Sequence, residues 1–273
     1  MDSGERPNWA PVDVDLARPS IARVYDYWLG GAHNFAIDRA VADKVLADVP
    51  VIKSIVLNHR AFLRRAVRFL LAQGIRQFLD LGSGIPTVGN VHEIAQATDP
   101  GARVVYVDVD AVAVAHSRAI LTGNELVSVL QADVRDAKQV LKSPEVQELL
   151  DFSQPIGVLM IALLHFVPDS EDPRGIVADY RDALPDGSYL TISHAGYEEG
   201  DWDPAWDDAK QVYNRGVSEM CFRRKHEVQA LFEGFDLVEP GVARLPLWRP
   251  ESPDDVDEDA ARFISFGGVG RKA

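Results

Sequence analysis

Cysteine is almost absent from this chain of 273 residues, which carries only Cys221. A single cysteine forms no disulfide framework and no zinc site built from cysteines. No apolar run approaches the roughly 20 residues that a membrane-spanning helix needs, and the polar first residues do not resemble a signal peptide. These absences predict a globular cytoplasmic protein that does not enter a membrane.

Basic residues are also scarce. The chain has 28 Lys and Arg and 42 Asp and Glu, which gives a net charge of -14. A nucleic-acid site usually needs a basic field that neutralises phosphates, so this balance argues against a nucleic-acid partner. Six acids crowd into a short stretch that we interpret as a solvated loop. They are Glu251, Asp254, Asp255, Asp257, Glu258 and Asp259.

The most informative stretch covers residues 78–87, where a short apolar run ends in Asp80 and breaks into Gly82-Ser83-Gly84. Glycine suits such a turn because it lets the backbone approach a ligand and adopts φ values that are closed to other residues. A helix is expected directly after the turn, with Pro86 near its first turn and its unpaired N–H groups facing the ligand.

Two further apolar runs also end in a carboxylate, at Asp108 and Asp133. In an open parallel sheet the carboxyl ends of the strands line one crevice, so Asp80, Asp108 and Asp133 are expected to face the same ligand. The crevice is therefore predicted to be acidic.

The missing third glycine narrows the choice of ligand. A dinucleotide fingerprint would place glycine at position 87, where this chain has threonine. Carboxylates repel a pyrophosphate but attract a cation, which favours S-adenosylmethionine with its sulfonium and ammonium groups. A nucleotide-dependent oxidoreductase and a non-catalytic cofactor-binding or interaction protein remain alternatives.

The rest of the pattern predicts an α/β fold, a sheet with helices on both faces. Expected strands are Gln77–Leu81, Arg103–Val107, Val127–Ala132, Ile156–Leu163, Ser188–Ser193, Phe235–Glu239 and Phe263–Val269. Expected helices are Ser20–Trp28, Ile37–Leu46, Lys53–Gln73, Val88–Thr98, Ala111–Thr122, Pro173–Leu184 and Arg223–Phe232. On the third helix, Arg64, Arg65 and Arg68 are interpreted as a solvated face.

Residues 74–87, 90–93 and 105–108 resemble class I S-adenosylmethionine-dependent methyltransferases, whose fold is Rossmann-like. Residues 25–31 and 185–190 also resemble an actinomycete family of S-adenosyl methyltransferases whose substrate is not assigned. The resemblance implies a seven-stranded, mostly parallel sheet over residues 57–273, with an insertion at about 196–220. It also favours an N-terminal arm and helical lid over residues 1–56, although a hydrophobic arm packed on the sheet is an alternative.

The resemblance also implies roles for individual residues around the cofactor. Gly82, Ser83 and Gly84 would approach its methionine part, and Asp80 would receive its ammonium group directly or through water. Asp108 would bind the ribose hydroxyls. The remaining implied cofactor contacts are Val109, Asp133 and Val134 near the adenine, Ala162 after the fourth strand, Tyr27 in the lid, and Arg60 for the methionine carboxylate.

The methyl acceptor is expected to be a small molecule with a nucleophilic oxygen or nitrogen, because motifs for methylating DNA bases are absent. His165, after the fourth strand, is the candidate general base, with a hydrogen-bonded structural histidine as the alternative. Asp169 and Glu171 are more simply surface acids than metal ligands, so no metal is predicted. Aromatic residues in the insertion would form a substrate cap or a buried helix edge. The oligomeric state stays open.

Overall fold

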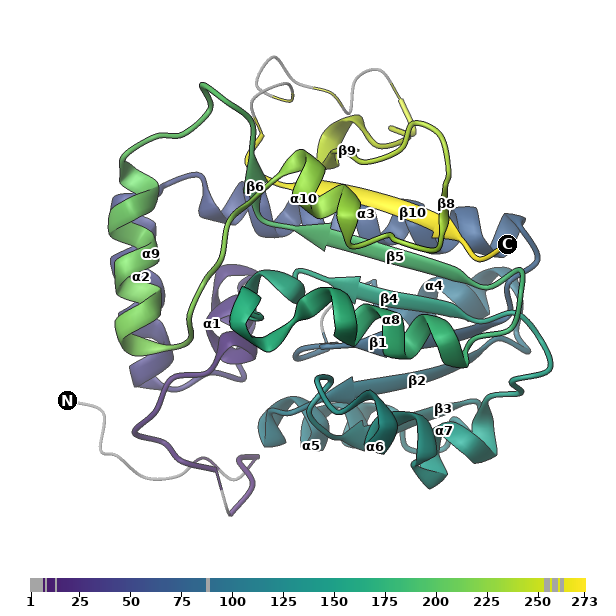
Figure 1. The fold of residues 1–273 in the computed structure, drawn as a ribbon. Coiled ribbons are helices and arrows are strands. Elements are labelled where there is room, and N and C mark those ends of the chain that lie inside the picture. Colours follow the sequence, from purple (N-terminus) through teal and green to yellow (C-terminus); the bar gives the residue numbers. More distant parts are fainter. Residues whose placement is uncertain are drawn as a thin grey trace.

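The structure is a computed structural model that describes residues 7, 9–12, 14–86, 89–252, 256, 260 and 263–273. Its strands are β1 (Gln77–Leu81), β2 (Arg103–Asp108), β3 (Val127–Gln131), β4 (Gly157–Ile161), β5 (Tyr189–His194), β6 (Gly196–Tyr197), β7 (Arg223–Arg224), β8 (Asp236–Leu237), β9 (Ala243–Arg244) and β10 (Phe266–Arg271). The main sheet runs β3-β2-β1-β4-β5-β10-β8, and β9 pairs with β10 beside that path (Figure 1).

The first five strands of this path are parallel, whereas β10 is antiparallel to both β5 and β8. The predicted α/β fold, with seven strands in a mostly parallel order, is confirmed. A separate parallel pair joins β6 to β7.

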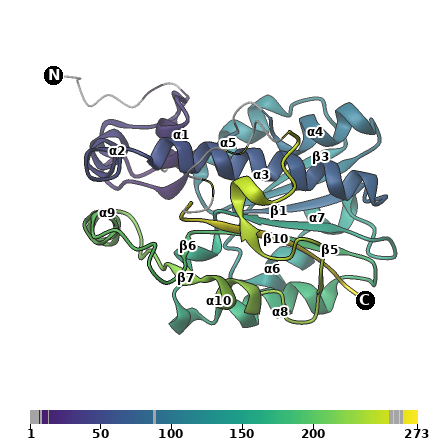
Figure 2. The ribbon, with the colours of Figure 1, turned by 90° about the horizontal axis from the view of Figure 1, so that it is seen from above.

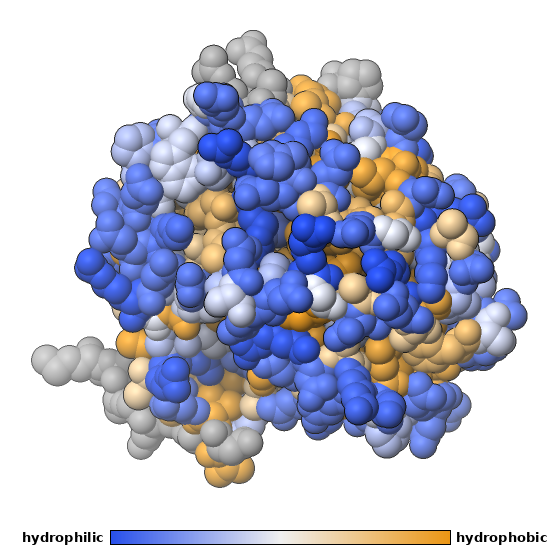
Figure 3. Space-filling model, viewed as in Figure 1, coloured by the Kyte–Doolittle hydropathy of each residue, from blue (hydrophilic) through white to orange (hydrophobic). Residues whose placement is uncertain are grey.

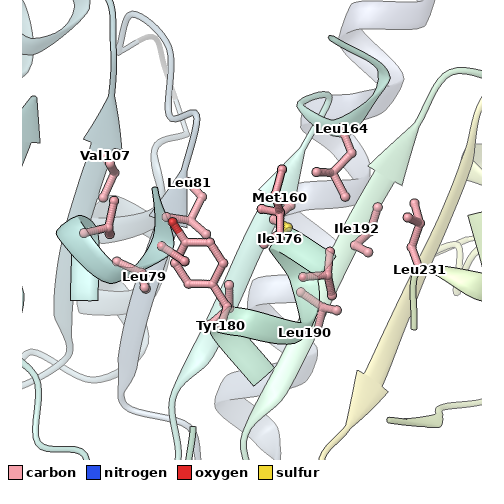
Figure 4. Packing of buried hydrophobic residues seen from close by; sticks show 14 of the residues in the cluster. Leu79, Leu81, Val107, Met160, Leu164, Ile176, Tyr180, Leu190, Ile192 and Leu231 are labelled. Atoms are coloured by element: carbon pink, nitrogen blue, oxygen red, sulfur yellow. The ribbon is translucent and has the colours of Figure 1, made fainter. Parts of the chain in front are cut away.

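Helices cover both faces of the sheet (Figure 2). One face carries α3 (Ile52–Ala72), α4 (Val91–Thr98) and α5 (Ala111–Ile120), and the other carries α6 (Ala137–Lys142), α7 (Pro144–Leu149), α8 (Pro173–Ala183) and α10 (Lys225–Ala230). Every residue of β1 is buried, as a central strand covered on both faces requires. Side chains alternate, so Phe78 packs under α3 while Leu79 and Leu81 turn toward Tyr180 of α8 (Figure 4).

Three helices lie at the carboxyl edge of the parallel strands: α1 (Ile21–Trp28), α2 (Ala36–Asp48) and α9 (Ala205–Gly216). They share one apolar cluster with the start of α3, built around Trp28, Trp206 and Tyr213. We call these three helices the helical cap. The aromatics of the insertion are thus largely buried in this cluster, and α9 packs against α2 from the N-terminal segment.

Most predicted boundaries lie within two or three residues of the observed ones, and the helix after the glycine turn begins three residues later than predicted. It begins at Val91 with Asn90 as N-cap, so Pro86 lies outside it in the loop. The Glu93 carboxylate accepts hydrogen bonds from the N–H groups of Gly89 and Asn90, at 2.8 and 2.9 Å, which fixes the later start. Position 87, where a dinucleotide motif would have its third glycine, and position 88 lie outside the described residues.

The C-terminal part also differs from the prediction in its details. The strand predicted over Phe235–Glu239 is only two residues long as β8, and β10 begins at Phe266 rather than Phe263. Helices α6 and α7 were not predicted. Of the acidic stretch, Glu251 pairs with Arg68 at 2.6 Å, whereas its four aspartates and one glutamate at 254–259 fall outside the described residues.

The face seen in Figure 3 is mostly hydrophilic, with apolar patches that are small and scattered. Within the described ranges, no helix combines the length and the apolar character that crossing a bilayer demands.

Candidate active site

The glycine turn lies where the order of strands reverses direction. The chain passes from β1 to β2 on one side, and β4 then joins β1 on the other, which makes the carboxyl end of β1 the switch point where such sheets bind ligands. Gly82 and Gly84 have φ values of 71° and 66°. A Cβ on Gly82 would lie 2.6 Å from Cδ1 of Leu163, so only glycine fits there.

Asp80 lies one residue before the end of β1 and faces the α3 side of the sheet, as Phe78 does. It lines a pocket together with Arg60, Ser83, Asn90 and Tyr106. The side chain is buried, and no described residue donates a hydrogen bond to it. Burial raises the pKa of Asp80 to about 7; Arg60 lowers it and Asp108 raises it further. A buried carboxylate in this state favours a cationic partner.

Arg60 projects from α3 into the same pocket, and its Nη2 donates to the Gly89 carbonyl over 2.9 Å. Its neighbours on the helix behave differently. Arg64 and Arg68 reach Glu251 at the surface. Arg65, however, is buried and donates to the carbonyls of residues 245 and 248, so the interpretation of Arg65 as part of a solvated face is wrong.

Asp108 ends β2 on the same face as Asp80 and braces the glycine turn. Its Oδ2 accepts from the Gly84 N–H at 2.7 Å, and its Oδ1 accepts from the Asp110 N–H at 2.8 Å. Burial raises the pKa of Asp108 to about 6, against the effect of these backbone donors. Asp110 in turn caps α5. The side chain of Val109, between them, is 66% exposed.

Asp133 lies at the same edge of the sheet but already has a charged partner. Arg135 Nε donates to its Oδ1 at 2.9 Å, and hydrogen bonding from Arg135 lowers the pKa of Asp133. Arg135 also bonds Glu171 at 2.6 Å. The Val134 carbonyl accepts from the Tyr180 hydroxyl at 2.8 Å. Of the three strand-end acids, Asp80 and Asp108 interact with each other, whereas Asp133 is neutralised locally.

The two acids that we weighed as metal ligands each have their own arginine. Glu171 pairs with Arg135, and Asp169 pairs with Arg223 at 2.6 Å. Among the residues that the structure describes, no group of three or more His, Cys, Asp or Glu side chains is arranged to hold a metal.

The N-terminal segment covers the glycine turn and the start of α5. Val14, Ala22 and Phe35 form one apolar cluster with Ile85 of the turn and with the first residues of α5. Arg23 of α1 pairs with buried Asp38 at 3.1 Å and lies 3.9 Å from Asp110. This packing is what a lid over the turn requires.

Tyr27 does not join the group around the pocket. Its hydroxyl donates to Asp43 of α2 at 2.9 Å, and it lies on the opposite side of α1 from Tyr25. Tyr25, which sequence reasoning missed, is close enough to Arg60 to feel its charge, and donates to the Val56 carbonyl at 3.1 Å. The spacing of two residues on one helix is the signal that separates the two tyrosines.

His165 lies in a buried cluster with His59 and His194 rather than at an open surface. Its Nδ1 accepts from the Ala195 N–H at 3.3 Å, so the proton of the neutral ring is on Nε2. Burial and the neighbouring histidines hold the pKa of His165 well below its usual range. Such a ring donates a hydrogen bond readily but is a poor proton acceptor, which favours the structural alternative for His165.

Comparison with known proteins agrees with this geometry. The sequence model of the S-adenosyl methyltransferase family matches residues 7–273. The chain belongs to the S-adenosyl methyltransferase family. The strand order given above, with β10 antiparallel, is accordingly the class I methyltransferase arrangement.

Two solved structures are similar to this protein over nearly the whole chain. A candidate methyltransferase of Thermobifida fusca is 41% identical over 97% of this chain and 99% of that one, with a TM-score of 0.90. A DUF574 family protein of Streptomyces avermitilis is 34% identical over 95% and 99%, also with a TM-score of 0.90. Among curated proteins, none matches.

A more distant structure shares the fold alone. The 1,6-didemethyltoxoflavin-N1-methyltransferase of Burkholderia thailandensis, solved with 1,6-didemethyltoxoflavin and S-adenosylhomocysteine, is 20% identical. The match covers 97% of this chain and 94% of that one, with a TM-score of 0.50.

Proposed function

We propose that the protein transfers a methyl group from S-adenosylmethionine to an oxygen or nitrogen of a small molecule. The observation that carries the proposal is Asp80, a buried carboxylate without a described hydrogen-bond donor, at the switch point of the sheet. A carboxylate in that position is stabilised by a cation, whereas it would repel the pyrophosphate of a dinucleotide. Membership of the family supports the same cofactor.

The donor set suits the amino acid part of this cofactor. Asp80 would bind the ammonium group, and the planar guanidinium of Arg60, which lines the same pocket, would bind the carboxylate. Asp108 would hold the ribose hydroxyls after its contact with Gly84 adjusts. Asp133 and Val134 are the proposed neighbours of the adenine, and Val109 and Ala162 complete the proposed set.

The cofactor, when bound, supplies an activated methyl group on a sulfonium centre. The residues of this chain then have to orient the acceptor and exclude water, which lowers the barrier without covalent participation. The helical cap and the N-terminal segment are the parts that would do so, because they cover the carboxyl edge of the sheet. We propose residues 1–56 as this lid.

A small-molecule acceptor is supported by two observations. The net charge of -14 disfavours a polyanionic acceptor such as nucleic acid. The distant Burkholderia thailandensis relative is named for N-methylation of a small molecule, and its fold matches nearly the full length of this chain. Since His165 is a poor base here, the acceptor is expected to bring its own lone pair, as an unprotonated nitrogen or an ionised oxygen.

Isothermal titration calorimetry with S-adenosylhomocysteine, S-adenosylmethionine and NADH tests the cofactor. Binding of the two adenosyl ligands without binding of NADH is expected, and the reverse result would contradict the proposal. Incubation with methyl-labelled S-adenosylmethionine and a metabolite library tests the reaction. Tight cofactor binding without label transfer to any member would favour a non-catalytic cofactor-binding protein instead.

A further inference from the structure

A buried chain of hydrogen bonds connects α3 to the end of β4. His59 of α3 lies between Ser193 of β5 and Ser265 just before β10, and all three side chains are buried. His59 Nδ1 is 2.7 Å from Ser193 Oγ, and His59 Nε2 is 3.2 Å from Ser265 Oγ. Ser193 Oγ also accepts from the Ala162 N–H at 3.0 Å.

The partners assign the direction of every proton in this chain. Ser265 Oγ also contacts the Ile264 carbonyl, which can only accept, so we assign its hydroxyl proton to that carbonyl and the role of acceptor from His59 Nε2–H to Ser265 Oγ. His59 Nδ1 is left as the acceptor for the Ser193 hydroxyl. Ser193 Oγ then has its lone pairs free for the Ala162 N–H, which also reaches the Ser193 carbonyl at 3.1 Å.

Ala162 is an unusual residue at an important place. It directly follows β4, beside the switch point, and has a φ of 53°, a conformation that residues with a Cβ adopt rarely and at a cost. The next residue, Leu163, lies against the glycine turn, in the space that a Cβ on Gly82 would need. Strained backbone of this kind persists only when surrounding interactions hold it, and it concentrates at functional sites.

The support that the structure describes for the Ala162 N–H comes from parts of the chain that are distant in sequence. The hydroxyl that receives its N–H comes from the neighbouring strand, and the imidazole that orients the hydroxyl comes from a helix 134 residues earlier than Ser193. We propose that His59 is a positioning residue, which acts through Ser193 to hold Ala162 and Leu163 against the glycine turn in the conformation that binds the methyl donor. This inference rests on the proposed function.

The test compares variants that differ in one link of the chain. Ser193→Ala removes the hydroxyl, and His59→Leu removes both ring nitrogens. In His59→Asn the side-chain carbonyl can take the place of Nδ1 as acceptor for Ser193. Thr191→Val is the matched control, because Thr191 lies on the same strand and its hydroxyl oxygen has no hydrogen-bond partner among the described residues.

Calorimetric titration with S-adenosylhomocysteine measures the effect. Ser193→Ala and His59→Leu are expected to bind about tenfold more weakly, the usual effect of losing one buried hydrogen bond. His59→Asn is expected to recover most of the affinity, and Thr191→Val to match the unmodified protein. Should His59→Leu fail to fold, Ser193→Ala and His59→Asn still give the comparison.

Two spectroscopic readouts separate positioning from general stability. Nitrogen NMR is expected to find His59 as the neutral Nε2–H form near pH 7, and amide exchange at Ala162 is expected to accelerate in Ser193→Ala but not in Thr191→Val. Equal affinity of Ser193→Ala and the unmodified protein, or the opposite His59 tautomer, would overturn the inference alone. Failure of the unmodified protein to bind the ligand would overturn the proposed function, and the cofactor role of His59 with it.

Discussion

Two groups of buried titratable side chains lie at the same edge of the sheet, and they differ in what offsets the free-energy cost of their burial. The acid pair consists of Asp80, one residue before the end of β1, and Asp108, the last residue of β2. The histidine cluster lies beside β4 and β5 and consists of His59, His165 and His194. Each histidine accepts or donates through an assigned ring nitrogen. Asp80 has no described donor at all.

The difference separates a scaffold from a binding site. A buried polar network with its partners in place rigidifies the fold, whereas a buried polar group without one carries a desolvation cost that a ligand can relieve. We therefore interpret the histidine cluster as support for the site and Asp80 as part of the site itself. Substitutions in each group test whether the two groups differ in this way.

The largest expected effect is an opposite response of the two groups to acid. Burial lowers the pKa of His59 to about 3 and raises the pKa of Asp80 to about 7. Between pH 6 and 5 the unfolded chain therefore holds a proton on His59, while the folded protein holds one on Asp80. As the pH falls in this window, the contribution of His59 to the stability of the folded protein decreases, and the contribution of Asp80 increases.

Urea unfolding of two variants at pH 6 and 5 measures this contrast. His59→Asn should make the free energy of unfolding fall less steeply with acid, and Asp80→Asn should make it fall more steeply. Each change is about 1.4 kcal/mol per pH unit, in opposite directions. If both substitutions changed the pH dependence of the free energy of unfolding in the same direction, the acid pair and the histidine cluster would not differ in how they respond to acid.

The second effect concerns the binding of the cofactor in Asp80→Asn. Loss of a charge-assisted hydrogen bond is expected to weaken S-adenosylhomocysteine binding by about thirtyfold, or about 2 kcal/mol. At neutral pH the cofactor-free variant should also melt at a higher temperature, because a buried charge is removed. Glu148→Gln, at an exposed acid of α7 for which the structure describes no hydrogen bond or ion pair, is the control and should change neither quantity. Unchanged affinity in Asp80→Asn would remove Asp80 from the site.

The two groups differ in how much of their arrangement can be predicted from the sequence. The apolar runs that end in acids predict the parallel strands and place Asp80 beside the turn, because both signals come from short stretches of the sequence. Asn90 and Glu93, three residues apart, form the capping-box pattern that marks the observed start of α4 at Val91. These features depend on residues close together in the chain.

The rest depends on packing between distant segments. Nothing near His59 indicates that Ser193 and Ser265 will meet it, 134 and 206 residues later. In the same way, the burial of Arg65 depends on the carbonyls of residues 245 and 248, 180 and 183 residues later. Tertiary contacts of this kind leave no periodic pattern in the sequence, so neither the histidine cluster nor the burial of Arg65 can be predicted from it.

The third effect is the pH dependence of cofactor binding by the unmodified protein. Asp80 must be ionised to bind an ammonium group, and its pKa in the free protein is about 7. Affinity is therefore expected to fall by about tenfold between pH 8 and pH 6, because only about one site in ten is then ionised. Calorimetry across this range measures it, and Asp80→Asn should keep only the roughly twofold loss expected from Asp108, whose pKa of about 6 leaves it half protonated at pH 6. A flat profile in the unmodified protein would mean that Asp80 is charged throughout.

The smallest effect tests the histidine side of the comparison at Thr191. Its buried hydroxyl oxygen has no hydrogen-bond partner among the described residues, so Thr191→Val removes a polar atom without breaking a network. The free energy of unfolding is expected to rise by about 0.5–1 kcal/mol, since the desolvation cost disappears while the shape is kept. Ser193→Ala, two residues along the same strand, should lower it instead, because His59 and Ala162 lose their common partner. If both substitutions proved equally harmless in urea unfolding, buried hydroxyls on β5 would be interchangeable, and the network around Ser193 would hold nothing in place.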